Sequence, residues 1–140
     1  MIGIRPAAGI ALLALTFTAM VLPAAEERMR TGLWEVTTSV DRQAATPRTS
    51  CYTLAMVEQA NLPEKTVREE TEKLLKKGGC TLKDFKLDGH SVSMSSVCPG
   101  SSVVSSSTYS GDAFETIAMS IADGVTRVSH FKGRRVGECK

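Results

Sequence analysis

The spacing of apolar residues predicts that strands dominate this chain. In residues 33–40 the apolar side chains, Trp34 and Val36 among them, share one face, while polar side chains take the alternate positions. This period of two is typical of a half-buried strand. A polar loop over residues 41–48 and a short second strand over residues 50–52 are expected next.

A helical period replaces the period of two over residues 53–77. A narrow apolar stripe that includes Leu74 and Leu75 follows helical spacing. Pro63 is tolerated in the first turn of a helix, so the segment is expected to break and restart there. The pair Gly78–Gly79 allows a left-handed turn and therefore ends the helix.

The period of two returns in the second half of the chain, where glycine turns separate short apolar runs. A two-residue turn at Asp88–Gly89 predicts a hairpin in which Phe85 faces Val92 and the apolar side chains of both strands share one face. Further strands are expected over residues 103–109, 113–121 and 125–131.

These elements define an α+β fold that is mostly β. We expect an antiparallel meander of about six strands, with a partly open barrel as a variant of that architecture. One helical segment at residues 53–77 is expected to pack on one face of the sheet or to cap one end.

Residues 1–25 have the three parts of a secretory signal peptide: a basic start, an apolar centre and small residues before the first acidic ones. The apolar run over residues 7–22 has about 16 residues, short of the roughly 20 needed to cross a bilayer. We therefore expect cleavage after Ala24 or Ala25. The mature chain, residues 26–140, is then a single exported domain with no stable membrane span.

The cysteines Cys51, Cys80, Cys98 and Cys139 all follow this segment, and an even number in a small exported domain indicates two disulfides. Their spacing fits neither a zinc site nor a thioredoxin-like motif. Of the three possible pairings we favour Cys80–Cys98, which brackets the predicted hairpin, with Cys51–Cys139, which joins the chain ends. The predicted register puts Cys80 and Cys98 on opposite faces. The pairing therefore requires a β-bulge or a three-residue loop, or is itself wrong.

The charge balance argues against nucleic-acid binding. Seventeen lysine and arginine residues against 15 acidic ones give a net charge of +2, without a strongly basic region. The chain has no G-x-S-x-G elbow, no glycine-rich phosphate loop and no H-E-x-x-H helix. We expect no metal, no cofactor and no catalytic residue that a motif can identify.

The two histidines are the remaining candidates for acid–base chemistry. His90 follows the predicted turn and His130 lies in the last strand. Either one needs a nearby carboxylate, such as Asp112 or Glu115, to act as a general base. A lone histidine in a turn or strand is more often a partly exposed side chain.

Two surface features are candidate binding sites. The basic residues Lys132, Arg134 and Arg135 could grip a carboxylate, phosphate or lipid headgroup, although a charged sheet edge is the simpler interpretation. The apolar face of the predicted sheet offers a possible ligand groove lined by Trp34, Phe85, Met94, Ile117 and Met119.

An ordered series of short motifs is similar to that of a known bacterial family. The motifs are Gly32–Val36, Cys51, Cys80 with Asp84–Phe85, Cys98–Gly100, Tyr109–Asp112 with Phe114–Glu115, and Gly133–Cys139. Together they resemble family number 3617 of the domains of unknown function, small exported proteins of Gram-negative bacteria. The resemblance covers nearly the whole mature chain, although the segment after Cys51 is longer and more charged than expected. It implies a periplasmic setting and no assigned activity, substrate or catalytic residue.

The leading functional hypothesis is a non-catalytic periplasmic binding or interaction module. A sheet with one aliphatic face and a single modest helix leaves a groove for an envelope protein or an apolar small molecule. A small periplasmic hydrolase using His90 or His130 and a purely structural envelope protein are the alternatives. A cavity enclosed by the apolar side chains would favour ligand binding. A solid core would leave partner binding.

Overall fold

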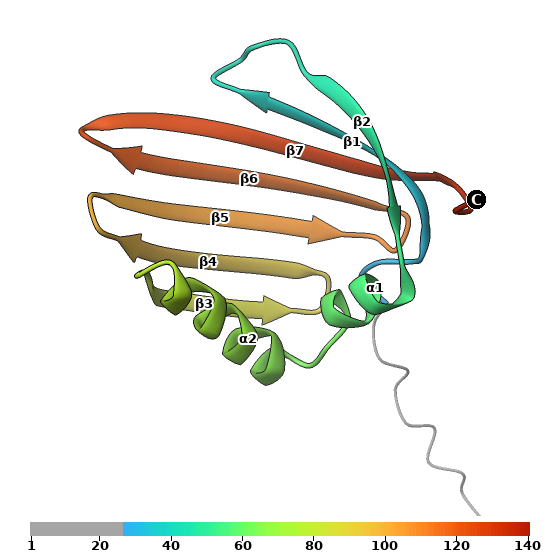
Figure 1. Ribbon diagram of the computed structural model, residues 1–140, viewed down its shortest axis with the longest axis horizontal. Coiled ribbons are helices and arrows are strands. Elements are labelled where there is room, and N and C mark those ends of the chain that lie inside the picture. Colours follow the sequence, from blue (N-terminus) through green and yellow to red (C-terminus); the bar gives the residue numbers. More distant parts are fainter. Residues whose placement is uncertain (1–26) are drawn as a thin grey trace, which may run out of the picture.

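The computed structural model describes residues 27–140, so the predicted signal peptide at residues 1–25 lies outside the described residues. The chain forms one open, seven-stranded antiparallel sheet in the order β2-β1-β7-β6-β5-β4-β3 (Figure 1). The elements are β1 (Gly32–Val40), β2 (Thr46–Tyr52), α1 (Leu54–Ala60), α2 (Glu64–Lys77), β3 (Thr81–Asp88), β4 (Ser91–Cys98), β5 (Ser101–Tyr109), β6 (Ala113–Ala122) and β7 (Val125–Gly137).

The strands from β3 to β7 form a meander, each paired with the next through a short turn. β1 then pairs with β7, and β2 forms the edge beyond it. The two helices connect β2 at one edge with β3 at the other edge (Figure 1). The predicted α+β, mostly β architecture with an antiparallel meander is therefore confirmed, with seven strands in place of about six.

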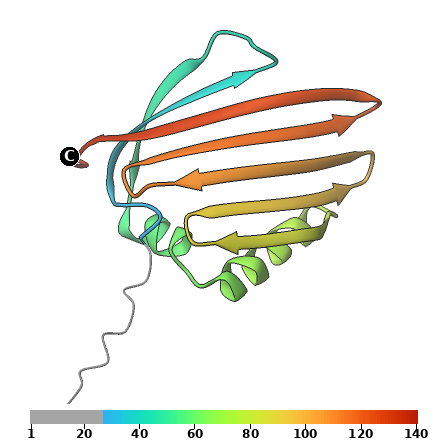
Figure 2. The same ribbon diagram turned by 180° about the vertical axis from the view of Figure 1, so that it is seen from behind.

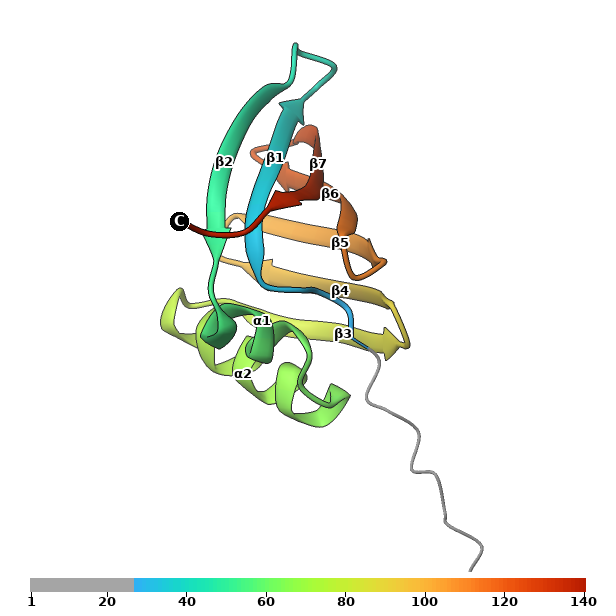
Figure 3. The same cartoon turned by 90° about the vertical axis from the view of Figure 1, so that its right-hand side faces the viewer.

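Both helices lie on the same side of the sheet. Seen from behind, the strands stand in front of α2 (Figure 2), and seen from the side the sheet curves with α1 and α2 below its concave face (Figure 3). α2 packs beside β3. We call the side that carries α1 and α2 the helix-side face and the opposite side the outer face.

The predicted helical segment divides into two helices at the expected break. Pro63 precedes α2, and the backbone N–H groups of Gly78 and Gly79 close the helix on the carbonyls of Leu75 and Lys76 at 3.0 Å. Gly79 has a φ of 73°, which favours glycine. No residue of α2 is fully buried, and Leu74 in the predicted apolar stripe is 70% exposed. α2 is therefore loosely seated on the sheet.

Two strands are longer than the sequence pattern predicts. β2 begins at Thr46, inside the segment predicted as a loop, and Pro47 pairs with Thr37 of β1. An edge strand tolerates proline because the missing N–H faces away from the sheet. β7 continues past residue 131 to Gly137, because β1 and β6 both pair with this part of it.

The predicted register of the β3–β4 hairpin is wrong by two residues. Phe85 faces Met94 and Leu87 faces Val92, so the two-residue turn is Gly89–His90. The apolar side chains still share one face, as predicted.

A β-bulge between Leu82 and Asp84 resolves the conflict over the cysteines. It changes the register before the strand reaches Cys80. The structure contains the disulfides Cys80–Cys98 and Cys51–Cys139, which is the favoured pairing.

The apolar core is small. Trp34 and Val57 are the fully buried apolar residues among those described. On the outer face, alternate positions of β6 carry Ile117, Met119 and Ile121, which are 41–45% exposed. Most of the packing therefore lies between the helix-side face and the two helices.

Candidate functional site

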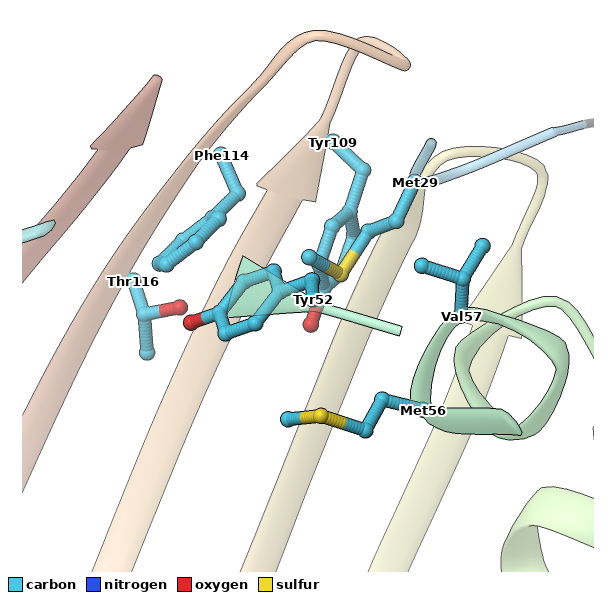
Figure 4. Close-up of a pocket in the computed structure, with 7 residues that line it drawn as sticks. All are labelled: Met29, Tyr52, Met56, Val57, Tyr109, Phe114 and Thr116. Atoms are coloured by element: carbon cyan, nitrogen blue, oxygen red, sulfur yellow. The ribbon is translucent and has the colours of Figure 1, made fainter. Parts of the chain in front are cut away.

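The best-defined cavity lies on the helix-side face, between α1 and the ends of the strands (Figure 4). It has a volume of about 260 Å³. Its walls come from the segment before β1, the end of β2, α1, and the adjoining ends of β5 and β6. The lining residues are Met29, Tyr52, Met56, Val57, Tyr109, Phe114 and Thr116.

Aromatic rings form one wall of this cavity. The ring of Trp34 lies behind the wall, 5.4 Å from that of Tyr52 and 5.8 Å from that of Phe114 between centroids. Tyr109 and Phe114 are 6.2 Å apart. Trp34 is completely buried and its Nε1–H donates to the Arg30 carbonyl at 3.0 Å, so the wall is anchored at its centre.

Hydroxyl groups are the polar features of an otherwise apolar cavity. Tyr52 and Tyr109 both contribute phenol rings (Figure 4), and the Thr116 hydroxyl shares a 2.8 Å hydrogen bond with that of Ser107. Burial, and then the neighbouring Tyr109, raise the pKa of Tyr52 above its ordinary value of 10.0. Tyr52 therefore stays a neutral hydroxyl at physiological pH. None of the lining side chains is charged.

A second cavity of about 180 Å³ lies under α2. Tyr109 lines both cavities, so its ring stands between them. The apolar lining residues of the second cavity are Ala60, Val67, Phe85, Leu87, Val92 and Met94. Arg28 also lines it and is the single charged residue of its wall.

Arg28 fixes the segment before β1 against α1. The residue is 6% exposed, and its Nε–H donates to the Ala60 carbonyl at 2.8 Å, at the C-terminal end of α1. The Asn61 side chain accepts from the backbone N–H groups of Arg28 and Met29 and donates to the Met29 carbonyl at 2.9 Å. A bridge between Met29 and Gly111 ties the segment to the β5–β6 turn. Met29 is thereby held in the cavity wall.

The groove residues predicted from the sequence are divided between the two faces. Phe85 and Met94 line the second cavity, and Trp34 supports the wall of the first. Met94 pairs with Ser105, and Ser105 pairs with Ala118, so Ala118 is on the same face as Met94. Ile117 and Met119, the two neighbours of Ala118 in β6, therefore lie on the outer face. These five residues therefore do not line a single groove.

The predicted basic cluster is distributed over ion pairs. Lys132 contacts Glu115 at 3.0 Å and Arg134 contacts Glu35 at 2.9 Å. Arg135 pairs with Glu138 and donates to the Thr31 carbonyl at 2.6 Å. Each cation thus has a protein partner. The simpler interpretation of a charged sheet edge is wrong in its placement, because β7 lies between β1 and β6.

Neither histidine forms an ion pair with the carboxylates proposed for it, although His130 is a diagonal neighbour of Glu115 across β6 and β7. His90 is in the β3–β4 turn, with its Nδ1 buried and without a hydrogen-bond partner, and His130 faces Ile117 across β6–β7. Asp112 pairs with Arg30 at 2.9 Å, and Glu115 pairs with Lys132. Neither histidine forms an ion pair within residues 27–140.

Sequence reasoning missed most of the first cavity. Met29 precedes the first strand, Met56 lies on a helix, and Tyr109 and Phe114 flank a turn, so no single period connects them. The signal that was available is the pair of aromatic residues on either side of residues 110–113. In an antiparallel hairpin such a pair faces across the turn, as Tyr109 and Phe114 do.

Within the described part of the chain, no helix is long and apolar enough for a membrane span. The same residues contain no group of three or more potential ligands from His, Cys, Asp and Glu that could hold a metal ion.

The fold and cavity define a small, disulfide-linked open sheet with an apolar pocket beneath its helices. Residues 29–139 match the family model described as Protein of unknown function (DUF3617), and the chain belongs to this family. No curated protein and no solved structure matches the chain.

Proposed function

We propose that this protein is a non-catalytic binding module of the periplasm that takes a small apolar ligand between α1 and the sheet. Export would follow from the predicted signal peptide at residues 1–25, and the two disulfides fit an oxidising compartment. Of the two predicted partners, an envelope protein and an apolar small molecule, this proposal takes the small molecule.

The main support for this proposal is the first cavity. Its lining combines methionine, valine and aromatic side chains with a few hydroxyl groups and no charge, which is the composition of a small-molecule site. Methionine adapts its shape to irregular ligands, and Met29 and Met56 stand on opposite walls (Figure 4).

α1 has the properties of a movable cover. It is short, and its side chains Leu54 and Met56 are 63% and 51% exposed, so few apolar contacts hold it in place. Val57 is its one buried residue. A ligand could therefore enter beside the exposed N-terminal turn of α1, since the hydrogen bonds of Arg28 and Asn61 hold only its C-terminal end.

The hydrolase alternative has less support, because Asp112 and Glu115 pair with cations and neither histidine lines the two cavities. A purely structural envelope protein would not need an apolar pocket. We therefore develop the ligand-binding function alone.

Binding of N-phenyl-1-naphthylamine, an apolar fluorescent probe, tests this function. Trp34 is the single tryptophan and contacts the cavity wall, so energy transfer from it reports a probe in the pocket. We expect saturable binding of one probe per chain. Met56→Glu places a charge at the pocket and should weaken binding by about tenfold or more.

Leu54→Glu is the matched control, since Leu54 lies on the same exposed helix and is not among the lining residues. Its affinity for the probe should be unchanged. Absence of saturable binding, or an equal loss in both variants, would contradict the proposed function.

A further inference from the structure

The positive charge of Arg28 is buried without an acidic partner. Its guanidinium donates to three backbone carbonyls, those of Ala60, Leu62 and Gly89. A guanidinium has five N–H donors, so these bonds leave two of them free. No carboxylate pairs with Arg28 among the ion pairs of residues 27–140. Arg30, Arg68, Arg134 and Arg135 each pair with one, and the other described arginines without such a pair, Arg42, Arg48 and Arg127, are exposed.

A buried charge is costly unless another charge compensates it. Carbonyl dipoles reduce this cost but leave the net charge in place. Arg28 also lines the second cavity, whose other walls are mainly apolar. An anionic group in this cavity would receive a charge-assisted hydrogen bond from Arg28, which is 6% exposed, and burial strengthens such bonds.

The size of the cavities restricts the body of such a ligand. Volumes of about 260 and 180 Å³ are small, since pockets for drug-sized ligands span roughly 300–1,000 Å³. We therefore expect a ligand with one narrow chain in this space. Both cavities have Tyr109 in their walls, so a chain that passes this ring would reach from one cavity into the other.

We propose that the ligand is a single-chain amphiphilic monocarboxylate, such as a fatty acid, whose carboxylate binds Arg28 and whose chain fills the cavities on either side of Tyr109. This inference rests on the proposed function. Arg28 then has two roles: it joins the N-terminal segment to α1 and it selects the charge of the ligand.

Competition of three ligands of equal chain length against the naphthylamine probe tests the inference. The ligands are dodecanoate, dodecanol and dodecylammonium. We expect dodecanoate to bind about tenfold more tightly than dodecanol, as a charge-assisted hydrogen bond implies, and dodecylammonium to bind most weakly.

Equal affinities for dodecanoate and dodecanol would overturn the inference while the proposed function stands. Binding of the probe without binding of any of the three dodecyl ligands would also overturn the inference alone. Failure of the probe itself to bind would remove the proposed function as well.

Two variants separate the charge of Arg28 from its structural contacts. Arg28→Met keeps an unbranched side chain and removes the charge, so the ratio of dodecanoate to dodecanol affinity should fall to about one. Asn61→Ala loosens the same segment but keeps the charge, and should preserve the wild-type ratio.

The ratio is measured within each folded variant and is independent of its stability. If Arg28→Met does not fold, the ligand series on the wild type decides the question. A ratio that is unchanged in Arg28→Met, or lost in Asn61→Ala, would refute the selection of charge by Arg28.

Discussion

At the scale of single residues, the pocket wall depends on the lack of a side chain at Gly133. Gly133 in β7 lies opposite Phe114 of β6 and Val36 of β1. A Cβ at this position would lie 2.6 Å from Cδ1 of Phe114 and closer still to Cε1. Glycine in a strand often marks such a close approach. Gly133 therefore provides the space in which the Phe114 ring turns toward Trp34 and the cavity.

Gly133→Ala should push Phe114 out of the wall. We expect a loss of about 1–3 kcal/mol in the free energy of unfolding, typical of overpacking, together with weaker probe binding. Gly137→Ala is the matched control in the same strand, since a Cβ there meets nothing within 4 Å. It should change stability by no more than about 0.5 kcal/mol. Urea unfolding measures both values, and similar losses in the two variants would show that Phe114 is not held by this contact.

Single-residue chemistry was partly predictable from the sequence. The role of Pro63 and the diglycine end of α2 follow from the backbone properties of these residues, and both are confirmed. The role of Arg28 was not predicted, because its partners Ala60, Leu62 and Gly89 are carbonyls far along the chain. Carbonyl groups are common to all residues and leave no pattern in a sequence.

At the scale of elements, the two disulfides constrain the chain over very different lengths. Cys80–Cys98 spans 18 residues and bridges the start of β3 to the end of β4. Cys51–Cys139 spans 88 residues and joins the edge strand β2 to the C-terminal residues. A longer closed loop removes more conformational entropy from the unfolded chain.

Removal of each bridge should therefore have a different cost. Replacing Cys80 and Cys98 with alanine is expected to lower the free energy of unfolding by about 3 kcal/mol, and replacing Cys51 and Cys139 by about 4.5 kcal/mol. Denaturant unfolding of the two double variants measures the difference. A larger loss for the shorter bridge would contradict this ranking.

The element pattern was predictable where it is local. The period of two gave the central strands, and the change to a helical period gave the segment at residues 53–77. The register of β3 and β4 was wrong because either of two adjacent dipeptides, Asp88–Gly89 and Gly89–His90, can form the two-residue turn. The start of β2 was missed because its polar sequence does not predict a strand. Its pairing with β1 stabilises the strand instead.

At the scale of the whole molecule, the open sheet separates two apolar surfaces. Helices cover one of them incompletely and leave the cavities, while the outer face exposes Ile117, Met119 and Ile121 to solvent. The sequence showed that these residues and Met94 are apolar, but not which face each one takes. The face depends on the pairing of four strands, and a shift of one residue in any pair reverses it. This is why Ile117 and Met119 lie on the opposite face from Phe85 and Met94.

Methionine methyl groups give the most direct test of the claim that the helix-side cavities bind an apolar ligand. Met29, Met56 and Met94 line the pockets of that face, and Met119 lies on the outer face. In the protein labelled with ¹³C at the methionine methyl groups, NMR spectra recorded with and without N-phenyl-1-naphthylamine would distinguish the two surfaces. The account predicts shifts for Met29 and Met56, and a smaller one for Met94, while Met119 stays unchanged. A shift of Met119 alone, or no shift at saturating probe, would contradict it.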